Sequence, residues 1–209
     1  MMLGNLKVGS RLGLGFGIML ALLLGVTLLG LIGVESLSDK LSVIGQANVK
    51  LVLAQELSDA EFRVARDMRT LVIVTDQDAM RDVKAGIDRA RDDYDSAWDR
   101  LGKLPLSEQG KALLSRIQEA REAVRPANDQ VTALGLANKA EEAQPVLLDR
   151  AFPGNKKVQD LLAELMDLQA RLTEEAVVQG ERAYAAARFW MALLAGIALL
   201  AGILIAFLI

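Results

Sequence analysis

The sequence contains neither cysteine nor histidine among its 209 residues. Without cysteine the chain forms no disulfide and offers no thiol nucleophile, and without histidine it lacks the commonest metal ligand and the usual proton-transfer group. It also lacks a G-x-S-x-G nucleophile motif and a glycine-rich phosphate-binding loop. We therefore expect no catalytic residues, no metal site and no cofactor, and a protein that is not an enzyme.

An excess of basic residues is also missing, because 27 acidic side chains face 24 basic ones. All the acidic residues and 22 of the basic ones lie between residues 35 and 188. A surface that binds nucleic acid needs lysine and arginine to neutralise phosphates. This middle region is mildly acidic, so we expect no nucleic-acid partner.

Two long runs without a charged side chain lie near the ends of the chain, at residues 12–34 and 189–209. As a helix, the first run would reach roughly 34 Å, against a hydrocarbon core of roughly 30 Å. We interpret the two runs as transmembrane helices. A cleaved signal peptide is the alternative for the first run, but the run is longer than the apolar region of a signal peptide and no A-x-A-like cleavage site follows it.

The charges that flank the first run predict its orientation. Lys7 and Arg11 precede it, and no acidic residue occurs before Glu35. Basic flanks stay in the cytoplasm. We therefore expect residues 1–11 to form a cytoplasmic amino terminus, and residues 35–188 to lie outside the cytoplasm between the two spans.

The middle region has apolar residues spaced alternately three and four apart, which is typical of amphipathic helices. The first helix should continue from the first span to about Thr75, and a second should occupy residues 78–103. Ser107 can cap a third helix that contains Pro126, and a last helix from residue 140 should be interrupted at 152–155, FPGN. No stretch has the alternation of a strand. These features predict an all-α fold, an antiparallel up-down four-helix bundle between two transmembrane helices.

Three stretches carry a resemblance to a known family: LKVGSRLGLGF before the first span, ELSDAEFRVARDMRTLVIVTDQD at the end of the first helix, and LMDLQARLTEEA in the last helix. With the predicted architecture, they resemble the amino-terminal half of bacterial methyl-accepting chemotaxis receptors of the four-helix-bundle sensor class. The resemblance implies a homodimer in the bacterial inner membrane, with a periplasmic sensor that passes a helix displacement across the membrane. In that family a HAMP linker and a cytoplasmic coiled coil follow the second span. We therefore expect a kinase and an adaptor to be reached only through a part beyond Ile209.

Several arginines lack an acidic partner three or four residues away on their own helix, where side chains meet. Arg66, Arg69 and Arg121 have none, whereas Arg125 has Glu122 and Asp129 within reach. Counting about 1.5 Å per residue places all four near one level, far from the membrane. A buried arginine needs an anion, and its planar fork matches a carboxylate. The resemblance adds support, because aspartate-type receptors of this class hold a ligand carboxylate with arginines of the first helix. We predict a site for a small anionic ligand, a carboxylate, formed by Arg66, Arg69, Thr70, Arg121 and Arg125.

Other interpretations remain open at this point. The arginines can instead pair with acids on neighbouring helices, such as those of the second helix. The same sensor module can also precede a histidine kinase or a cyclic-dinucleotide enzyme, which only residues beyond Ile209 would distinguish. A structural membrane protein whose bundle binds a protein partner is a third possibility, and an exposed apolar patch outside the spans would favour it.

Overall fold

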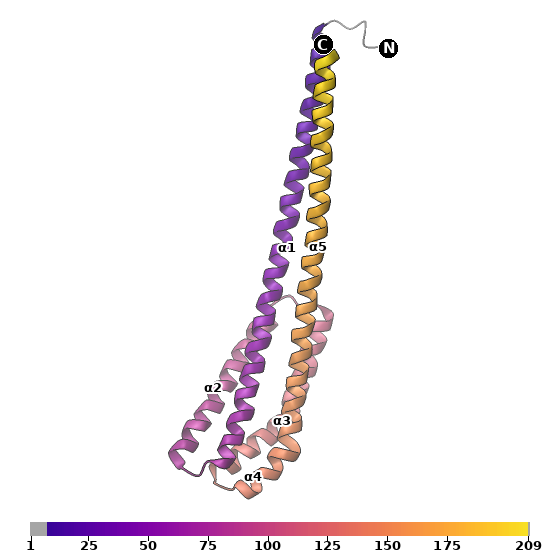
Figure 1. Ribbon diagram of the computed structural model, residues 1–209. Helices are drawn as coiled ribbons and strands as arrows, with labels where there is room; N and C mark the ends of the chain where they lie inside the picture. Colours follow the sequence, from indigo (N-terminus) through magenta and orange to yellow (C-terminus); the bar gives the residue numbers. More distant parts are fainter. Residues whose placement is uncertain (1–7, 209) are drawn as a thin grey trace. The chain divides into compact units, whose positions relative to one another are not determined.

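The computed structural model describes residues 8–208, which are helical apart from short turns. Within this range the chain forms five α-helices and one π-helical turn (Figure 1). In order these are α1 Val8–Ile73, α2 Gln77–Gly102, α3 Glu108–Leu136, α4 Ala140–Val146, η1 Leu147–Ala151 and α5 Phe152–Leu208. The predicted all-α class is confirmed.

The chain divides into two compact units, one of residues 46–173 and one of residues 1–45 and 174–209. The first unit is an up-down bundle of α2, α3 and the adjoining parts of α1 and α5, with α4 and η1 beside them (Figure 1). Two hydrophobic clusters fill its interior. One is built around Leu57, Tyr94, Ile117 and Leu162, and the other around Met68, Ile87, Val131 and Ala151.

Side-chain caps start α2 and α3. The Ser107 hydroxyl accepts a hydrogen bond from the Gly110 amide at 3.1 Å, which confirms the predicted cap of α3. Asp76 caps α2 in the same way, with the Ala79 amide at 2.9 Å. Each cap satisfies an amide that has no partner inside its helix. The turn after α3 contains Asn138 at a φ of 56°, a conformation that asparagine tolerates better than most residues.

The interruption predicted at residues 152–155 is wrong in its position and form. The irregular segment is the π-helical turn Leu147–Ala151, and α5 begins at Phe152. The Phe152 amide donates to the Leu147 carbonyl, five residues back. Pro153 has no N–H, and its ring would crowd the carbonyl of Asp149 in a regular α-helix. A wider turn relieves this contact, so proline inserts a bulge and the helix continues.

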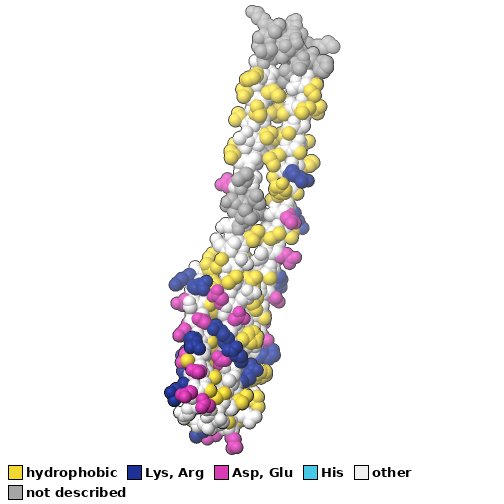
Figure 2. All heavy atoms as spheres, turned by 60° about the vertical axis from the view of Figure 1, so that its left-hand side comes forward, with side chains coloured by type: hydrophobic (Ala, Val, Ile, Leu, Met, Phe, Trp, Pro, Cys, Tyr) yellow, Lys and Arg dark blue, Asp and Glu magenta, His cyan; other side chains and the backbone are white. Residues whose placement is uncertain are grey.

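The second unit contains two helices that are long and apolar enough to cross a membrane. One covers Gly15–Gly33 in α1, and the other lies within the helical stretch Ala140–Ile203, towards the end of α5. Large apolar side chains such as Leu24, Leu28, Phe189 and Leu200 are exposed along them, and Figure 2 shows such side chains on both helices. The two helices contact each other where a Cβ added at Gly33 would lie 3.8 Å from the Ala187 Cβ. The exact span boundaries stay predictions, and most of the predicted cytoplasmic terminus lies outside the described residues.

Candidate ligand-binding site

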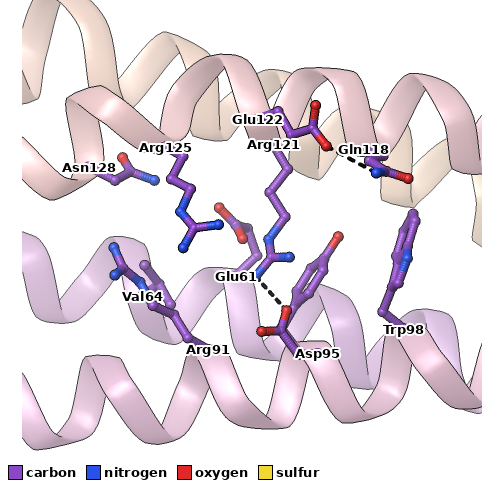
Figure 3. A pocket seen from close by; sticks show the side chains of 11 residues that line it. Glu61, Val64, Arg91, Asp95, Trp98, Gln118, Arg121, Glu122, Arg125 and Asn128 are labelled. Atoms are coloured by element: carbon purple, nitrogen blue, oxygen red, sulfur yellow. Dashed lines mark hydrogen bonds and ion pairs between the residues drawn. The ribbon is translucent and has the colours of Figure 1, made fainter.

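A polar cavity of about 300 Å³ lies between α1, α2 and α3, inside the bundle unit (Figure 3). Its volume is at the lower end of the range for small-molecule sites. Charged, amide and aromatic side chains line it: Glu61, Arg91, Tyr94, Asp95, Trp98, Gln118, Arg121, Glu122, Arg125 and Asn128, with Val64.

Charged residues occupy positions between core residues on two of the helices that line the cavity, α1 and α3. Glu61 lies between the buried Leu57 and Val64 of α1, at spacings of four and three residues. Arg121 occupies the same place between Ile117 and Val124 of α3. Residues at these spacings share one helix face. These charged side chains therefore face the interior of the bundle, near the boundary between the two hydrophobic clusters.

Arg121 has partners on α2. Its Nη2 lies 2.8 Å from Asp95 Oδ1, and its guanidinium carbon lies 3.9 Å from the centroid of the Tyr94 ring. The Tyr94 ring stacks on Trp98 with centroids 6.0 Å apart. An arginine over an aromatic face is attracted by the ring quadrupole. The alternative prediction, that an arginine pairs with an acid of the second helix, therefore holds for Arg121.

Two further arginines share one carboxylate at the other side of the cavity. Arg91 Nη2 lies 2.7 Å from Asp129 Oδ1, while Arg125 Nε lies 3.9 Å from Asp129 Oδ2. The Arg125 side chain is 74% exposed, against 29% for Arg91. Arg125 is therefore loosely paired, and most of its donors have no partner among the described residues.

Glu61 differs from the other acids of the cavity because it is buried and has no ion-pair partner among the described residues. It is 4% exposed, and its Oε1 has no hydrogen-bond partner in the part of the chain that the structure describes. Tyr94 is 1% exposed, and its hydroxyl also lacks a hydrogen-bond partner among the described residues. Burial raises the pKa of the Glu61 carboxyl above its ordinary value of 4.5, although the positive charges of Arg121 and Arg91 oppose the shift. Burial likewise raises the pKa of Tyr94.

The residues predicted on α1 lie elsewhere. Arg66 pairs with the adjacent Asp67 at 2.8 Å, and the Thr70 hydroxyl donates to the Arg66 carbonyl. Arg69 donates to the Ala65 carbonyl and lines a second cavity of about 230 Å³ between α1 and α5, together with Lys156. The structure thus brings Arg121 and Arg125 together but does not bring Arg66, Arg69 or Thr70 to them. The binding roles of all five stay predictions.

A buried amide pair connects the two cavities. Asn128 lines the first and Asn155 the second. Asn128 Nδ2 donates to Asn155 Oδ1 at 2.9 Å, and Asn155 Nδ2 donates back to Asn128 Oδ1 at 3.1 Å. Both residues are buried, so the pair fixes α5 against α3 at the level of the polar cavity.

Sequence reasoning missed Glu61 and Arg91. Glu61 has Leu57, Ser58, Val64 and Ala65 three and four residues away, none of them basic. Like Arg66 and Arg121, Glu61 therefore has no oppositely charged residue within reach on its own helix. Arg91 gave no such signal, because Asp88 and Asp95 lie within reach on its own helix.

Comparison with known proteins agrees with this architecture. The model of a family described as a four-helix-bundle sensory module for signal transduction matches residues 5–184. The match covers most of the chain, so the chain belongs to this family, whose members are sensor modules of signalling receptors and not catalytic domains.

Among characterised proteins, the chain is similar to the methyl-accepting chemotaxis protein McpQ of Pseudomonas putida. The two are 32% identical over 150 residues, which is 68% of this chain and 20% of the relative. The chain therefore spans about a fifth of the length of that receptor. The predicted resemblance to chemotaxis receptors is confirmed, and the chain is a sensory module of the chemoreceptor type.

Proposed function

We propose that this chain is the sensor region of a transmembrane chemoreceptor and that it binds a small carboxylate in the cavity between α1, α2 and α3. The observation that carries the proposal is the set of three arginines, Arg91, Arg121 and Arg125, around one small cavity. Each guanidinium has five N–H donors, and the ion pairs to Asp95 and Asp129 use only some of them. The remaining donors suit the planar oxygens of a carboxylate.

The proposal places the bundle in the periplasm, between two spans of a bacterial inner-membrane protein that acts as a homodimer. The two apolar helices and the basic residues Lys7 and Arg11 support this topology. Output would reach a cytoplasmic kinase and adaptor through a part beyond Ile209. The similarity to a chemotaxis receptor favours this output over a histidine kinase or a cyclic-dinucleotide enzyme.

Transmission would use α5, which is one helix from Phe152 to Leu208. A ligand that contacts Asn128 would act on Asn155 through their two hydrogen bonds, and a shift of α5 by an ångström or two is a known form of signalling. Cysteines at Gly33 and Ala187 would report it, since their Cβ atoms would lie 3.8 Å apart, within disulfide range, and the chain has no other cysteine. We expect saturating ligand to change the cross-linking rate. An unchanged rate would contradict transmission by helix displacement.

Binding is tested by calorimetric titration of the full chain in nanodiscs with a panel of mono-, di- and tricarboxylates. We expect at least one carboxylate to bind. Arg125→Ala should reduce its affinity about tenfold or more, and each factor of ten corresponds to about 1.4 kcal/mol of binding free energy. Arg116→Ala is the matched control, because Arg116 lies on the same helix, pairs with Glu164 at 3.0 Å and does not line the cavity. If no carboxylate binds, or if the control loses as much affinity as Arg125→Ala, the proposed site is wrong.

A further inference from the structure

The two buried oxygen atoms that lack a hydrogen-bond partner among the described side chains both belong to the same cavity. They are Glu61 Oε1 and the Tyr94 hydroxyl. Buried polar groups are nearly always paired, since an unpaired one keeps the full cost of leaving water. A buried carboxylate without a partner is more costly still. Two such groups on one small cavity indicate that something binds there and supplies the missing partners.

The charges around Glu61 show which partner is missing. Arg121 is engaged by Asp95 at 2.8 Å and Arg91 by Asp129 at 2.7 Å. Glu122, the other acid of the lining, accepts a hydrogen bond from Gln118 at 3.0 Å. No lysine or arginine of the described bundle forms an ion pair with Glu61. The cavity therefore has an acceptor that its own cations do not reach.

We propose that Glu61 is a specificity-determining residue that selects a carboxylate ligand carrying a protonated amine close to its carboxylate. This inference rests on the proposed function. The ligand carboxylate would bind Arg125 and the free donors of Arg121, and the ammonium would bind Glu61. Glu61, Arg121 and Arg125 all line the same cavity of about 300 Å³, and in the view of Figure 3 Glu61 lies between the two arginines.

An ammonium group meets the demands of this position better than a neutral donor does. It has three N–H donors, so it can bind Glu61 Oε1 and still donate to the Tyr94 hydroxyl oxygen. It also neutralises the buried carboxylate, which a hydroxyl or an amide would not do. Removing the cost of an unpaired buried charge then adds to the affinity of the amine-bearing ligand and not to that of its analogue without the amine.

The test uses the full chain in nanodiscs and calorimetric titration with matched pairs of probes. Each pair is a carboxylate with and without its amine: aspartate and succinate, glutamate and glutarate, alanine and propionate. We expect at least one amine-bearing member to bind about tenfold or more tightly than its partner. In Glu61→Gln this preference should disappear, and the partner without the amine should bind as tightly as before or more tightly.

Glu119→Gln is the matched control, because it removes the same charge from an exposed position of α3 that does not line the cavity. We expect it to keep the preference. Glu61→Gln should fold, as thermal unfolding will show, since it removes an unpaired buried charge. If Glu61→Gln does not fold, Glu61→Asp serves in its place. It withdraws the carboxylate by one methylene group and should reduce the preference for the amine-bearing ligand.

Two outcomes overturn the inference. One is an amine preference that survives in Glu61→Gln, and the other is an absence of any amine preference in the unaltered chain. If succinate, glutarate or propionate still binds and binding depends on Arg125, the proposed carboxylate function stands while the role of Glu61 falls. If no carboxylate of any kind binds, both fail.

Discussion

The bundle has two pairs of arginines, Arg66 and Arg69 on α1 and Arg121 and Arg125 on α3. Counting residues along the helices predicts a similar distance from the membrane for both pairs, but the structure gives them different surroundings. Arg66 is 67% exposed and pairs with its neighbour Asp67, whereas Arg121 is 32% exposed and holds Asp95 and the Tyr94 ring of another helix. Only the α3 pair lines the polar cavity. The absence of an acid on the same helix therefore does not show whether an arginine lines the cavity.

The helix face on which an arginine lies explains the difference. Arg121 lies between Ile117 and Val124, both buried in the core. Arg66 shares its face with Phe62 and Ile73, which are exposed. A side chain on the inner face meets other helices, while one on the outer face meets water. The functional difference between the pairs should follow from this geometry, and the following substitutions test it.

The largest effect on stability is expected for Arg121→Ala. The substitution leaves Asp95 unpaired, removes the cation from the Tyr94 ring, and takes a positive charge away from the buried Glu61. We expect a loss of about 1–2 kcal/mol, kept small by the partial exposure of the ion pair. Urea unfolding of the full chain followed by circular dichroism measures it. A change no larger than that of Arg66→Ala would contradict the distinction between the two pairs.

A similar loss, of about 1–2 kcal/mol, is expected for Asn128→Leu, which leaves the Asn155 amide buried without its partner. The double variant Asn128→Leu, Asn155→Leu removes both polar groups and should recover part of the loss. The same unfolding measurement gives the coupling between the two positions. If the double variant loses the sum of the single losses, the pair does not link α3 to α5 in the way proposed.

The buried carboxyl of Glu61, on the inner face of α1, should also make the stability of the bundle depend on pH. Because the pKa of Glu61 is raised in the folded protein, the folded state holds this proton more tightly than the unfolded state does. The free energy of unfolding should therefore fall as pH rises from 4.5 through the folded-state pKa. Glu61→Gln should lack this component. Unfolding midpoints measured without ligand at a series of pH values upward from 4.5 test this, and equal slopes in both proteins would contradict it.

The smallest effect is expected for Arg66→Ala. The Arg66 pair with Asp67 is formed by adjacent residues at the surface, where ion pairs contribute little. We expect an unfolding midpoint equal to that of the unaltered chain. A clear loss would show that Arg66 contributes more than an exposed pair with its neighbour does, and would contradict the distinction between the two faces.

Much of the fold follows from the sequence, because helix periodicity and caps are local properties. The long first helix, the cap at Ser107 and the second helix all lie within a few residues of their predicted places. The sequence predicts an interruption of the helix at Pro153, but the structure has a π-helical turn just before it. Both arrangements accommodate the proline, so its presence alone does not distinguish them. Whether a proline ends a helix or widens one turn depends on packing with other helices, which periodicity does not reveal.

The site was less predictable because its pairings cross between helices. Asp88 and Asp95 are within reach of Arg91 on α2, but each forms an ion pair with another residue: Asp88 with Lys84, and Asp95 with Arg121. Arg91 pairs instead with Asp129 on α3. Nothing in the spacing of these residues distinguishes the two sets of partners. Glu61 was within reach of sequence reasoning, because a buried-face acid without a base on its own helix is as informative as an arginine without an acid.

The most direct test of the account compares one arginine of each pair in the same titration. The carboxylate of the panel that binds the unaltered chain most tightly should bind Arg125→Ala about tenfold or more weakly and Arg66→Ala with unchanged affinity. That result would place the ligand in the cavity between α1, α2 and α3. Loss of affinity in Arg66→Ala with none in Arg125→Ala would contradict the account and place the ligand on the outer face of α1.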